Sequence, residues 1–157
     1  MMRRKDREIT DIEEIRDIIE KCKVCRLAMQ DEEGLYLVPL NFGYEFEKES
    51  LALYFHSAKE GRKLRAIQKN SKVCFEMDCE HALIEANIPC AYGYEYACVM
   101  GNGKAMILEH TEEKRLALSK LMWHQTGKAF EISEQMSDSV VVIKVIAESY
   151  TGKMCRS

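Results

Sequence analysis

The sequence lacks both a long hydrophobic run and an excess of basic residues. No stretch approaches the roughly 20 consecutive apolar residues that span a bilayer, and the N-terminal MMRRKDREITDIEE is charged where a secretion signal would be apolar. The formal net charge is −3, which argues against a general nucleic-acid binder. These absences predict a soluble, cytoplasmic protein whose partners include neither a membrane nor nucleic acid.

The chain also lacks internal repeats, low-complexity tracts and recognisable linkers. Its 157 residues are enough for a domain with a sizeable core, so we predict a single domain over residues 1–157. No G-x-S-x-G, H-E-x-x-H or P-loop motif occurs. The hydrolytic chemistry that those motifs support is therefore not indicated.

Cysteine is abundant, but its spacing does not indicate a metal site. The number of cysteines, seven, is odd, and the sequence shows no secretion signal. We therefore expect the thiols to be reduced. Cys22 and Cys25 form one C-x-x-C. A structural zinc site usually needs a second, well-spaced pair, which Cys74, Cys79 and His81 do not provide. We expect no metal ion, and the role of the Cys22/Cys25 pair stays open.

The pattern of apolar residues predicts more strands than helices. Thr10 and Glu13 form a capping box, so a helix should begin there. The polar turns DEEG and EKES separate three strand-like runs, which are typical of an antiparallel meander. Pro39, in the second run, cannot donate to a ladder and indicates a free edge or an irregularity. Gly101 and Gly103 predict a bulge in a later, long strand.

These elements favour a mainly β fold. The total is about six strands and two or three helices, and the connections are too short for repeated parallel crossovers. We therefore predict a closed or nearly closed antiparallel β-barrel with flanking helices. Residues 80–93 contain Pro89 and Gly93 without a clean period, and a loop is expected there.

The stretch LYFHSAKEGRKLRAI, residues 53–67, carries the clearest functional signal. A strand runs straight into a helix, and an S-x-x-E capping box begins at Ser57. A helix N-terminus offers unpaired N–H groups that suit a phosphate. Lys59, Arg62 and Lys63 add cations where they would disfavour an isolated helix. The spacing fits either a phosphate-binding corner or a capped surface helix with a solvated basic face.

The sequence context of two of the four histidines indicates what role each residue has. His56 lies at the end of a strand beside the predicted phosphate corner, which makes it a candidate functional residue. His124, next to Trp123 near a helix end, is interpreted as structural.

Together these motifs resemble the pyridoxamine phosphate oxidase-like flavoproteins that adopt the FMN-binding split barrel, and most closely their nitroimidazole-resistance (Nim-type) branch. The resemblance runs through CRLAMQDEEGLYLVPLNFGYE, LYFHSAKEGRKLRAI, KVCFEMD, YEYACVMGNGKAMIL and VIAESYTGK, in this order. The tail TGKMCRS lacks the arginine-rich end of the biosynthetic oxidase. The chain is therefore similar to the family rather than to that enzyme.

The resemblance implies a homodimer that holds FMN in grooves at its interface and acts on a small-molecule substrate. The implied cofactor-binding residues are Val38, Pro39, Leu40 and Asn41 at the isoalloxazine ring, Phe55, His56, Ser57, Lys59, Arg62 and Lys63 at the phosphate and ribityl end, and Tyr96 and Cys98 supplied by the second chain. His56 is also the implied catalytic residue, because a histidine near the open face of the flavin could orient substrate or move a proton.

The implied function is an oxidoreductase that passes electrons from a reduced nicotinamide or another donor to a small organic acceptor, as a nitroimidazole reductase would. Relatives often have serine where Cys98 stands and a basic residue where Ala97 stands. This difference implies that the present chain loses one polar contact to FMN or holds FMN more loosely. One alternative is a non-catalytic flavin- or haem-binding module, which needs the same pocket. Another is a small barrel that contacts protein or nucleic acid through its basic cluster, which the acidic overall balance disfavours.

Overall fold

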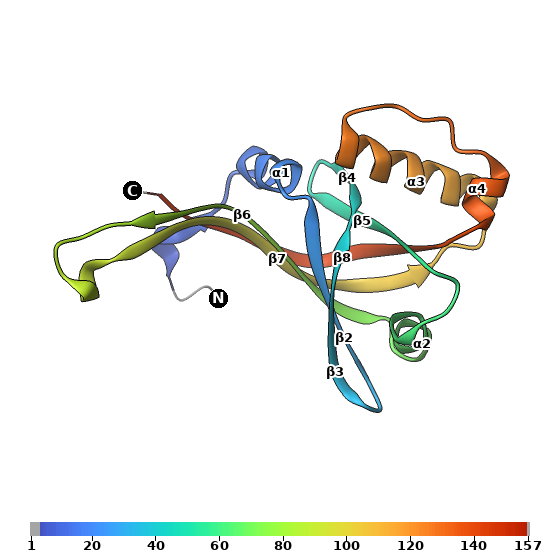
Figure 1. Cartoon of the computed structure of the whole chain (residues 1–157), viewed down its shortest axis with the longest axis horizontal. Helices are drawn as coiled ribbons and strands as arrows, with labels where there is room; N and C mark the ends of the chain where they lie inside the picture. The colour runs from blue at the N-terminus through green and yellow to red at the C-terminus, as the bar shows by residue number, and fades with distance from the viewer. Residues whose placement is uncertain (1–3, 157) are drawn as a thin grey trace.

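The computed structural model describes residues 4–156 as one curled sheet with helices packed around it (Figure 1). In chain order the elements are the 3₁₀ helix η1 (Lys5–Arg7), β1 (Glu8–Ile9), α1 (Ile12–Lys21), β2 (Val24–Asp31), β3 (Gly34–Asn41), β4 (Gly43–Glu47), β5 (Ser50–Ser57), α2 (Arg62–Lys69), β6 (Lys72–Ile84), the 3₁₀ helix η2 (Pro89–Ala91), β7 (Gly93–Ile107), α3 (Thr111–Thr126), α4 (Glu134–Asp138) and β8 (Val141–Cys155). None of the described helices is long and apolar enough to cross a membrane.

The sheet runs in the order β3-β2-β6-β7-β8-β5-β4, with β1 added beside β8, and neighbouring strands are antiparallel. The end strands β3 and β4 do not pair with each other, so the barrel is not closed within the described residues. The sheet curls far enough for β3 to contact β5. The mainly β fold with flanking helices is confirmed, but the sheet has eight strands rather than about six.

The extra strands arise at two places. β1 has only two residues, and the predicted second run divides at Phe42 into β3 and β4. Phe42 is fully buried, and its carbonyl accepts a hydrogen bond from Gln125 Nε2 of α3 at 2.9 Å. The chain crosses there from one end of the sheet to the other, so two separate hairpins replace the predicted meander. Pro39 lies on the end strand β3, which confirms the free edge predicted from its missing N–H.

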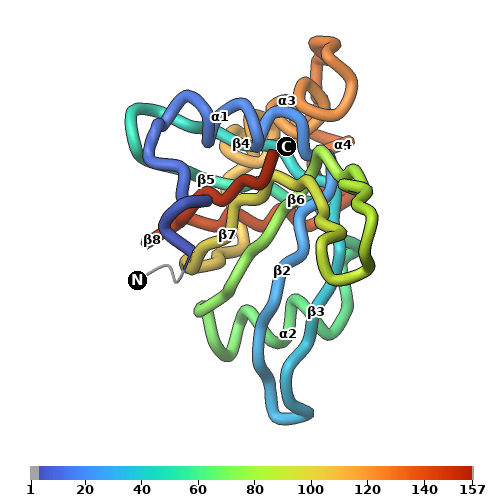
Figure 2. Tube along the Cα trace, turned by 90° about the vertical axis from the view of Figure 1, so that its left-hand side faces the viewer, coloured from blue at the N-terminus to red at the C-terminus, as the bar shows by residue number. Residues whose placement is uncertain are grey.

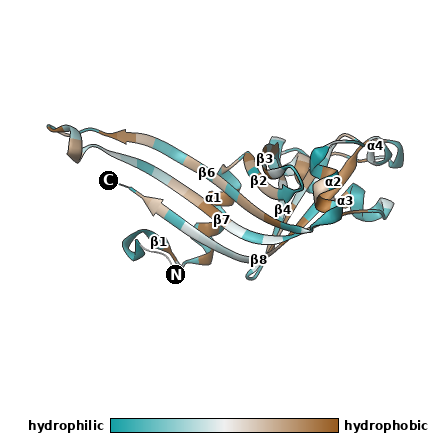
Figure 3. Cartoon of the chain, turned by 90° about the horizontal axis from the view of Figure 1, so that it is seen from below, coloured by the Kyte–Doolittle hydropathy of each residue, from teal (hydrophilic) through white to brown (hydrophobic). Residues whose placement is uncertain are grey.

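The predicted loop at residues 80–93 is wrong only in its bounds: residues 85–92 connect the strands and contain η2, whereas residues 80–84 extend β6 and Gly93 begins β7 of a long hairpin. Ladder pairs join Leu83 to Tyr94 and Ile84 to Gly93 beyond a register shift, with η2 near the tip. Figure 3 shows β6, β7 and β8 side by side, with the hairpin extending past the end of β8. Cross-strand pairing within this hairpin extends both strands although the sequence shows no clean period there.

The predicted bulge in the long strand is confirmed. The register between β7 and β8 shifts between Asn102 and Gly103. At Gly101 a Cβ atom would lie 2.3 Å from the carbonyl oxygen of Ser149, so only glycine allows β8 to approach this closely.

The helices cover the sheet with their apolar faces. Ile15, Ile18 and Ile19 of α1 are buried in the main core. The capping residue of α1 is Asp11 rather than the predicted Thr10, because the Asp11 carboxylate accepts from the N–H of Glu13 at 2.9 Å. α3 packs against β4, β5 and β8. Figure 2 shows α1 and α3 near the top of the molecule and α2 near its bottom.

Candidate functional site

The end of β5 and the start of α2 form a corner where the sequence predicts a phosphate site. The predicted capping box between Ser57 and Glu60 is wrong, because Ser57 is the last residue of β5 and pairs with Val141 of β8. α2 begins after Gly61, whose φ of 152° lies in a region that favours glycine. No side chain of the described residues caps this helix. Its first N–H groups are therefore open to a ligand.

Ser57 places a buried hydroxyl at this corner. The residue is only 4% exposed, and its Oγ has no hydrogen-bond partner among residues 4–156. A buried hydroxyl without a partner costs roughly 1–3 kcal/mol. A bound group with acceptor atoms would remove that cost.

Two cations of the predicted set are available at the corner. Lys59 is exposed and Lys63 half-buried, and within the described part of the chain neither forms an ion pair. We call Ser57, Lys59, Gly61 and Lys63 the basic corner. Its groups are hydrogen-bond donors and positive charges, which together suit an anion.

Arg62 differs from these two lysines because its guanidinium is already bound. Its Nε and Nη2 donate to the Asp31 carboxylate at 2.7 and 2.8 Å, and its Cζ lies 4.7 Å from the ring centre of Tyr36. The hydrogen bond from Arg62 lowers the pKa of Asp31 to about 2. Arg62 thus fastens α2 to the β2–β3 hairpin. Sequence reasoning missed Asp31 and Tyr36, because the segment around them indicated only a turn and a strand.

The predicted ring-side residues lie along β3. Val38 and Leu40 point to the side of the sheet that carries the main core, whereas Pro39 points to the other side. The Asn41 side-chain amide donates to the Lys23 carbonyl at 3.1 Å. Because β3 is the last strand in the described sheet, one edge of its backbone stays open. Contacts through main-chain groups require such an edge.

Phe55 and His56 stand side by side at the end of β5 but differ in exposure. The Phe55 side chain is fully buried, with its ring centre 6.4 Å from that of Phe42, so it can offer a ligand only its backbone. His56 is exposed and directly precedes Ser57. Because side chains alternate along a strand, the exposed His56 imidazole lies on the opposite face of β5 from the buried Ser57 hydroxyl.

Tyr96 and Cys98 lie far from this corner within one chain. Cys98 pairs with Lys153 near the end of β8, whereas Ser57 pairs with Val141 at its beginning. Twelve residues of strand separate those two positions, roughly 40 Å of extended backbone. Tyr96 and Cys98 are therefore not brought next to the basic corner within one chain, and their supply by a second copy stays a prediction.

The C-x-x-C pair lies in the core. Cys22 and Cys25 are buried, and burial raises the pKa of both thiols, that of Cys25 to about 12. Both belong to the main apolar cluster. In the described part of the chain, no group of three histidine, cysteine or acidic residues is placed to hold a metal ion.

Comparison with known proteins gives a consistent result. The sequence profile described as pyridoxamine 5′-phosphate oxidase matches residues 11–154. A search of curated proteins finds no match. Among solved structures, a candidate 5-nitroimidazole antibiotic resistance protein from Bacteroides thetaiotaomicron is 36% identical at a TM-score of 0.81, and the match covers 94% of this chain and 86% of that chain.

Two more distant structures share the fold. The flavocytochrome Anf3 from Azotobacter vinelandii is 14% identical at a TM-score of 0.81, with 100% of this chain and 73% of that chain covered. A FAD-binding protein from Mesorhizobium loti is 22% identical at a TM-score of 0.68, with 96% and 98% covered. The antiparallel split barrel that the family resemblance implies is confirmed by these matches.

Proposed function

The chain belongs to the pyridoxamine 5′-phosphate oxidase family, and from this premise we propose that it is a homodimeric flavoprotein that binds FMN and reduces a small organic acceptor. The basic corner carries the proposal. A buried hydroxyl without a partner, a helix N-terminus without a side-chain cap and two ammonium groups occur together between residues 57 and 63 of the described chain. Each of these groups is suited to bind a phosphate.

The phosphate end of FMN fits this corner. Ser57 would donate its hydroxyl hydrogen to a phosphate oxygen, and the first N–H groups of α2 would donate to others. Lys59 and Lys63 would balance the charge. Arg62 is already bound to Asp31, so we assign it the placement of α2 rather than a direct share of the phosphate charge.

The ring end would lie along the open edge of β3. Main-chain groups of the segment 38–41 would contact the polar edge of the ring, and Phe55 would contribute through its backbone. Tyr96 and Cys98 of the second copy would complete each groove, because within one chain they lie far from Ser57 along β8.

When bound, FMN would supply the electron-transfer chemistry between a reduced nicotinamide, or another donor, and the acceptor. His56, exposed next to Ser57, would orient the substrate or move a proton at its imidazole. The 36% identity to a candidate 5-nitroimidazole resistance protein supports a nitroaromatic acceptor.

The first test is the absorption spectrum and mass of the purified protein. We expect a yellow protein whose flavin bands bleach with a chemical reductant, and light scattering should give twice the chain mass of 18.2 kDa. A colourless protein that does not bind added FMN would refute the proposal that the chain is a flavoprotein. A strictly monomeric protein would refute the shared groove.

The second test separates turnover from binding. Steady-state oxidation of NADH or NADPH with 5-nitroimidazole acceptors should be detectable, and His56→Gln should lower turnover roughly a hundredfold with little change in FMN affinity. His110→Gln alters another exposed histidine, at the start of α3, and serves as the control. A protein that binds flavin yet turns over no acceptor would instead be a flavin- or haem-binding module.

A further inference from the structure

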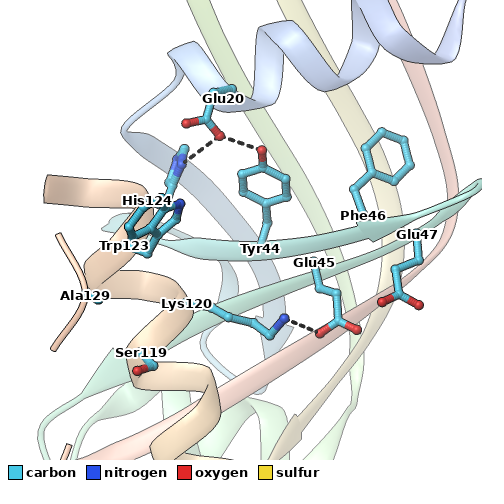
Figure 4. A pocket seen from close by; sticks show the side chains of 10 residues that line it. All are labelled: Glu20, Tyr44, Glu45, Phe46, Glu47, Ser119, Lys120, Trp123, His124 and Ala129. Atoms are coloured by element: carbon cyan, nitrogen blue, oxygen red, sulfur yellow. Dashed lines mark hydrogen bonds and ion pairs between the residues drawn. The ribbon is translucent and has the colours of Figure 1, made fainter. Parts of the chain in front are cut away.

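A second buried polar atom without a partner lies in a groove between α1, β4 and α3 (Figure 4). The groove has a volume of about 500 Å³, which is in the range of small-molecule sites. None of the residues proposed to hold FMN lines it. α1 and α3 lie near the top of Figures 1 and 2 and α2 near the bottom, so the groove is separate from the basic corner.

His124 of α3 turns a lone pair toward this groove. The residue is 3% exposed, and its Nε2 lies 2.7 Å from the Cys22 carbonyl oxygen. Because a carbonyl oxygen only accepts, Nε2 carries the proton, and burial lowers the pKa of His124, which keeps the ring neutral near pH 7. Nδ1 is then an acceptor without a partner among the described residues. It lies 3.6 Å from Glu20 Oε2, beyond hydrogen-bond reach.

Glu20 of α1 presents a second acceptor to the same space. The hydroxyl of Tyr44 donates to Glu20 Oε2 at 2.5 Å, and burial raises the pKa of Tyr44, so its proton stays in place at ordinary pH. Oε1 of Glu20 receives no hydrogen bond from residues 4–156. Figure 4 shows His124 and Tyr44 on either side of this carboxylate. A single donor group placed here could satisfy both His124 Nδ1 and Glu20.

The rest of the lining adds negative charge and an aromatic surface. Glu45 and Glu47 also line the groove, and Lys120 is the one cation among the lining residues. The Lys120 ammonium lies 2.9 Å from the Glu45 carboxylate, which leaves Glu20 and Glu47 without a balancing charge. Trp123 is 58% exposed at this groove, and an indole face attracts cations. We call this set of lining residues the acidic groove.

Neighbouring cations do not fill the acidic groove. Arg16 donates to the Phe46 carbonyl at 2.8 Å, and Lys23 donates to the carbonyls of Glu20 and His124 at 3.0 and 2.7 Å. Main-chain oxygens hold both side chains, and neither residue belongs to the lining. The described residues hold no three-ligand group for a metal ion either. No side chain of the described residues therefore donates to His124 Nδ1.

We propose that the acidic groove binds a small organic cation, a protonated amine or an amidinium, whose N–H groups donate to His124 Nδ1 and Glu20 while its body packs against Trp123. An anion would be repelled by the lining carboxylates. An uncharged ligand of the same shape would leave those carboxylates without a counter-charge. The site does not depend on whether the chain binds flavin.

Benzamidine and benzamide are suitable probes, because they share a planar shape while only benzamidinium carries a charge. Trp123 is the single tryptophan of the chain, so its fluorescence reports on the acidic groove directly. Benzamidine added to the purified full-length protein should change this fluorescence saturably, with no change in the absorption of bound flavin. Benzamide at the same concentrations should have no saturable effect. Equal responses to both probes, or no saturable response to benzamidine, would overturn the proposal.

Glu20→Gln tests the donor assignment. Glutamine keeps the size of the side chain and can still accept from Tyr44, and the Glu20 side chain is 56% exposed, so the variant should fold. Its affinity for benzamidine should fall roughly tenfold. Glu14→Gln, an exposed position of α1 outside the lining, is the matched control and should bind as the wild type does. Unchanged affinity in a folded Glu20→Gln protein would contradict the assignment.

Discussion

The basic corner and the acidic groove each contain one buried side chain with an unsatisfied polar atom. These are Ser57 Oγ and His124 Nδ1, and they are the two such atoms in the described part of the chain. Ser57 is followed within six residues by two lysines and the uncapped start of α2, whereas His124 lines a groove with three glutamates. Burial without a partner marks both places as candidate binding sites. The surrounding charges then determine the sign of the ligand, an anion at the corner and a cation in the groove.

The largest effect should come from removing the free cations of the basic corner. In the double variant Lys59→Ala/Lys63→Ala, FMN affinity should fall roughly a hundredfold, because each charge-assisted hydrogen bond to the phosphate contributes about 1.5–3 kcal/mol. The melting temperature of the flavin-free protein should change little, since neither lysine forms an ion pair within residues 4–156. Flavin fluorescence titration measures the affinity.

A lysine outside the corner provides the control for this variant. Lys69→Ala changes the last residue of α2, whose ammonium lies 2.5 Å from Glu32. Its FMN affinity should match that of the wild type. Equal losses in Lys69→Ala and in the double variant would show that general charge, rather than the corner, attracts FMN.

Ser57→Ala should separate binding from stability. Removing the hydroxyl takes away one donor to the phosphate, so FMN affinity should fall roughly tenfold. The flavin-free protein should be as stable as the wild type or more stable, because a buried polar atom without a partner is replaced by an apolar one. Chemical unfolding measures the stability of the flavin-free protein, and flavin titration measures the FMN affinity. A less stable protein with unchanged FMN affinity would mean that the hydroxyl serves the fold and not a ligand.

Asp31→Asn should have a smaller effect that depends on pH. Arg62 lowers the pKa of Asp31 from 3.8 to about 2, so the pair stabilises the folded state above about pH 4 and loses this effect as the pH falls toward 2. Asp31→Asn should therefore melt below the wild type at pH 7, and the gap should shrink on lowering the pH to about 3. Its FMN affinity should fall less than that of Ser57→Ala, since Arg62 is assigned to placing α2. A gap that is constant with pH would contradict the ion pair.

The two regions also show what a sequence can reveal. The groups of the basic corner are neighbours along the chain, so their spacing and the family resemblance are enough to single them out as a predicted phosphate site. Glu20, Tyr44 and His124 come from three different elements and meet only after folding. His124 was interpreted as structural. Its burial agrees with that interpretation, but the direction of its lone pair depends on the carbonyl of Cys22, 102 residues away.

The features of the fold also fall into those that local sequence patterns predict and those that they do not. Local alternation and turn residues predicted most strands and the free edge at Pro39. The split at Phe42 and the open barrel depend on pairing between strands that are far apart in the sequence, such as β2 with β6 and β5 with β8, which no local pattern contains. The ion pair of Arg62 with Asp31 is a further case: the sequence predicted a cation at the right place but not the acid that occupies it.

The smallest effect should come from a gain of negative charge in the acidic groove. Lys120→Met removes the one ammonium of the lining and keeps an unbranched stem that can pack. Glu45 then loses its ion pair but keeps the hydrogen bond from the Tyr54 hydroxyl. Benzamidine affinity should rise roughly threefold, because an exposed charge at this range contributes about 1 kcal/mol or less. The gain should disappear at roughly 0.5 M salt, where the charges are screened, and FMN affinity at the basic corner should not change. Weaker benzamidine binding in this variant, or a gain that persists at high salt, would show that charge does not select the ligand of the groove.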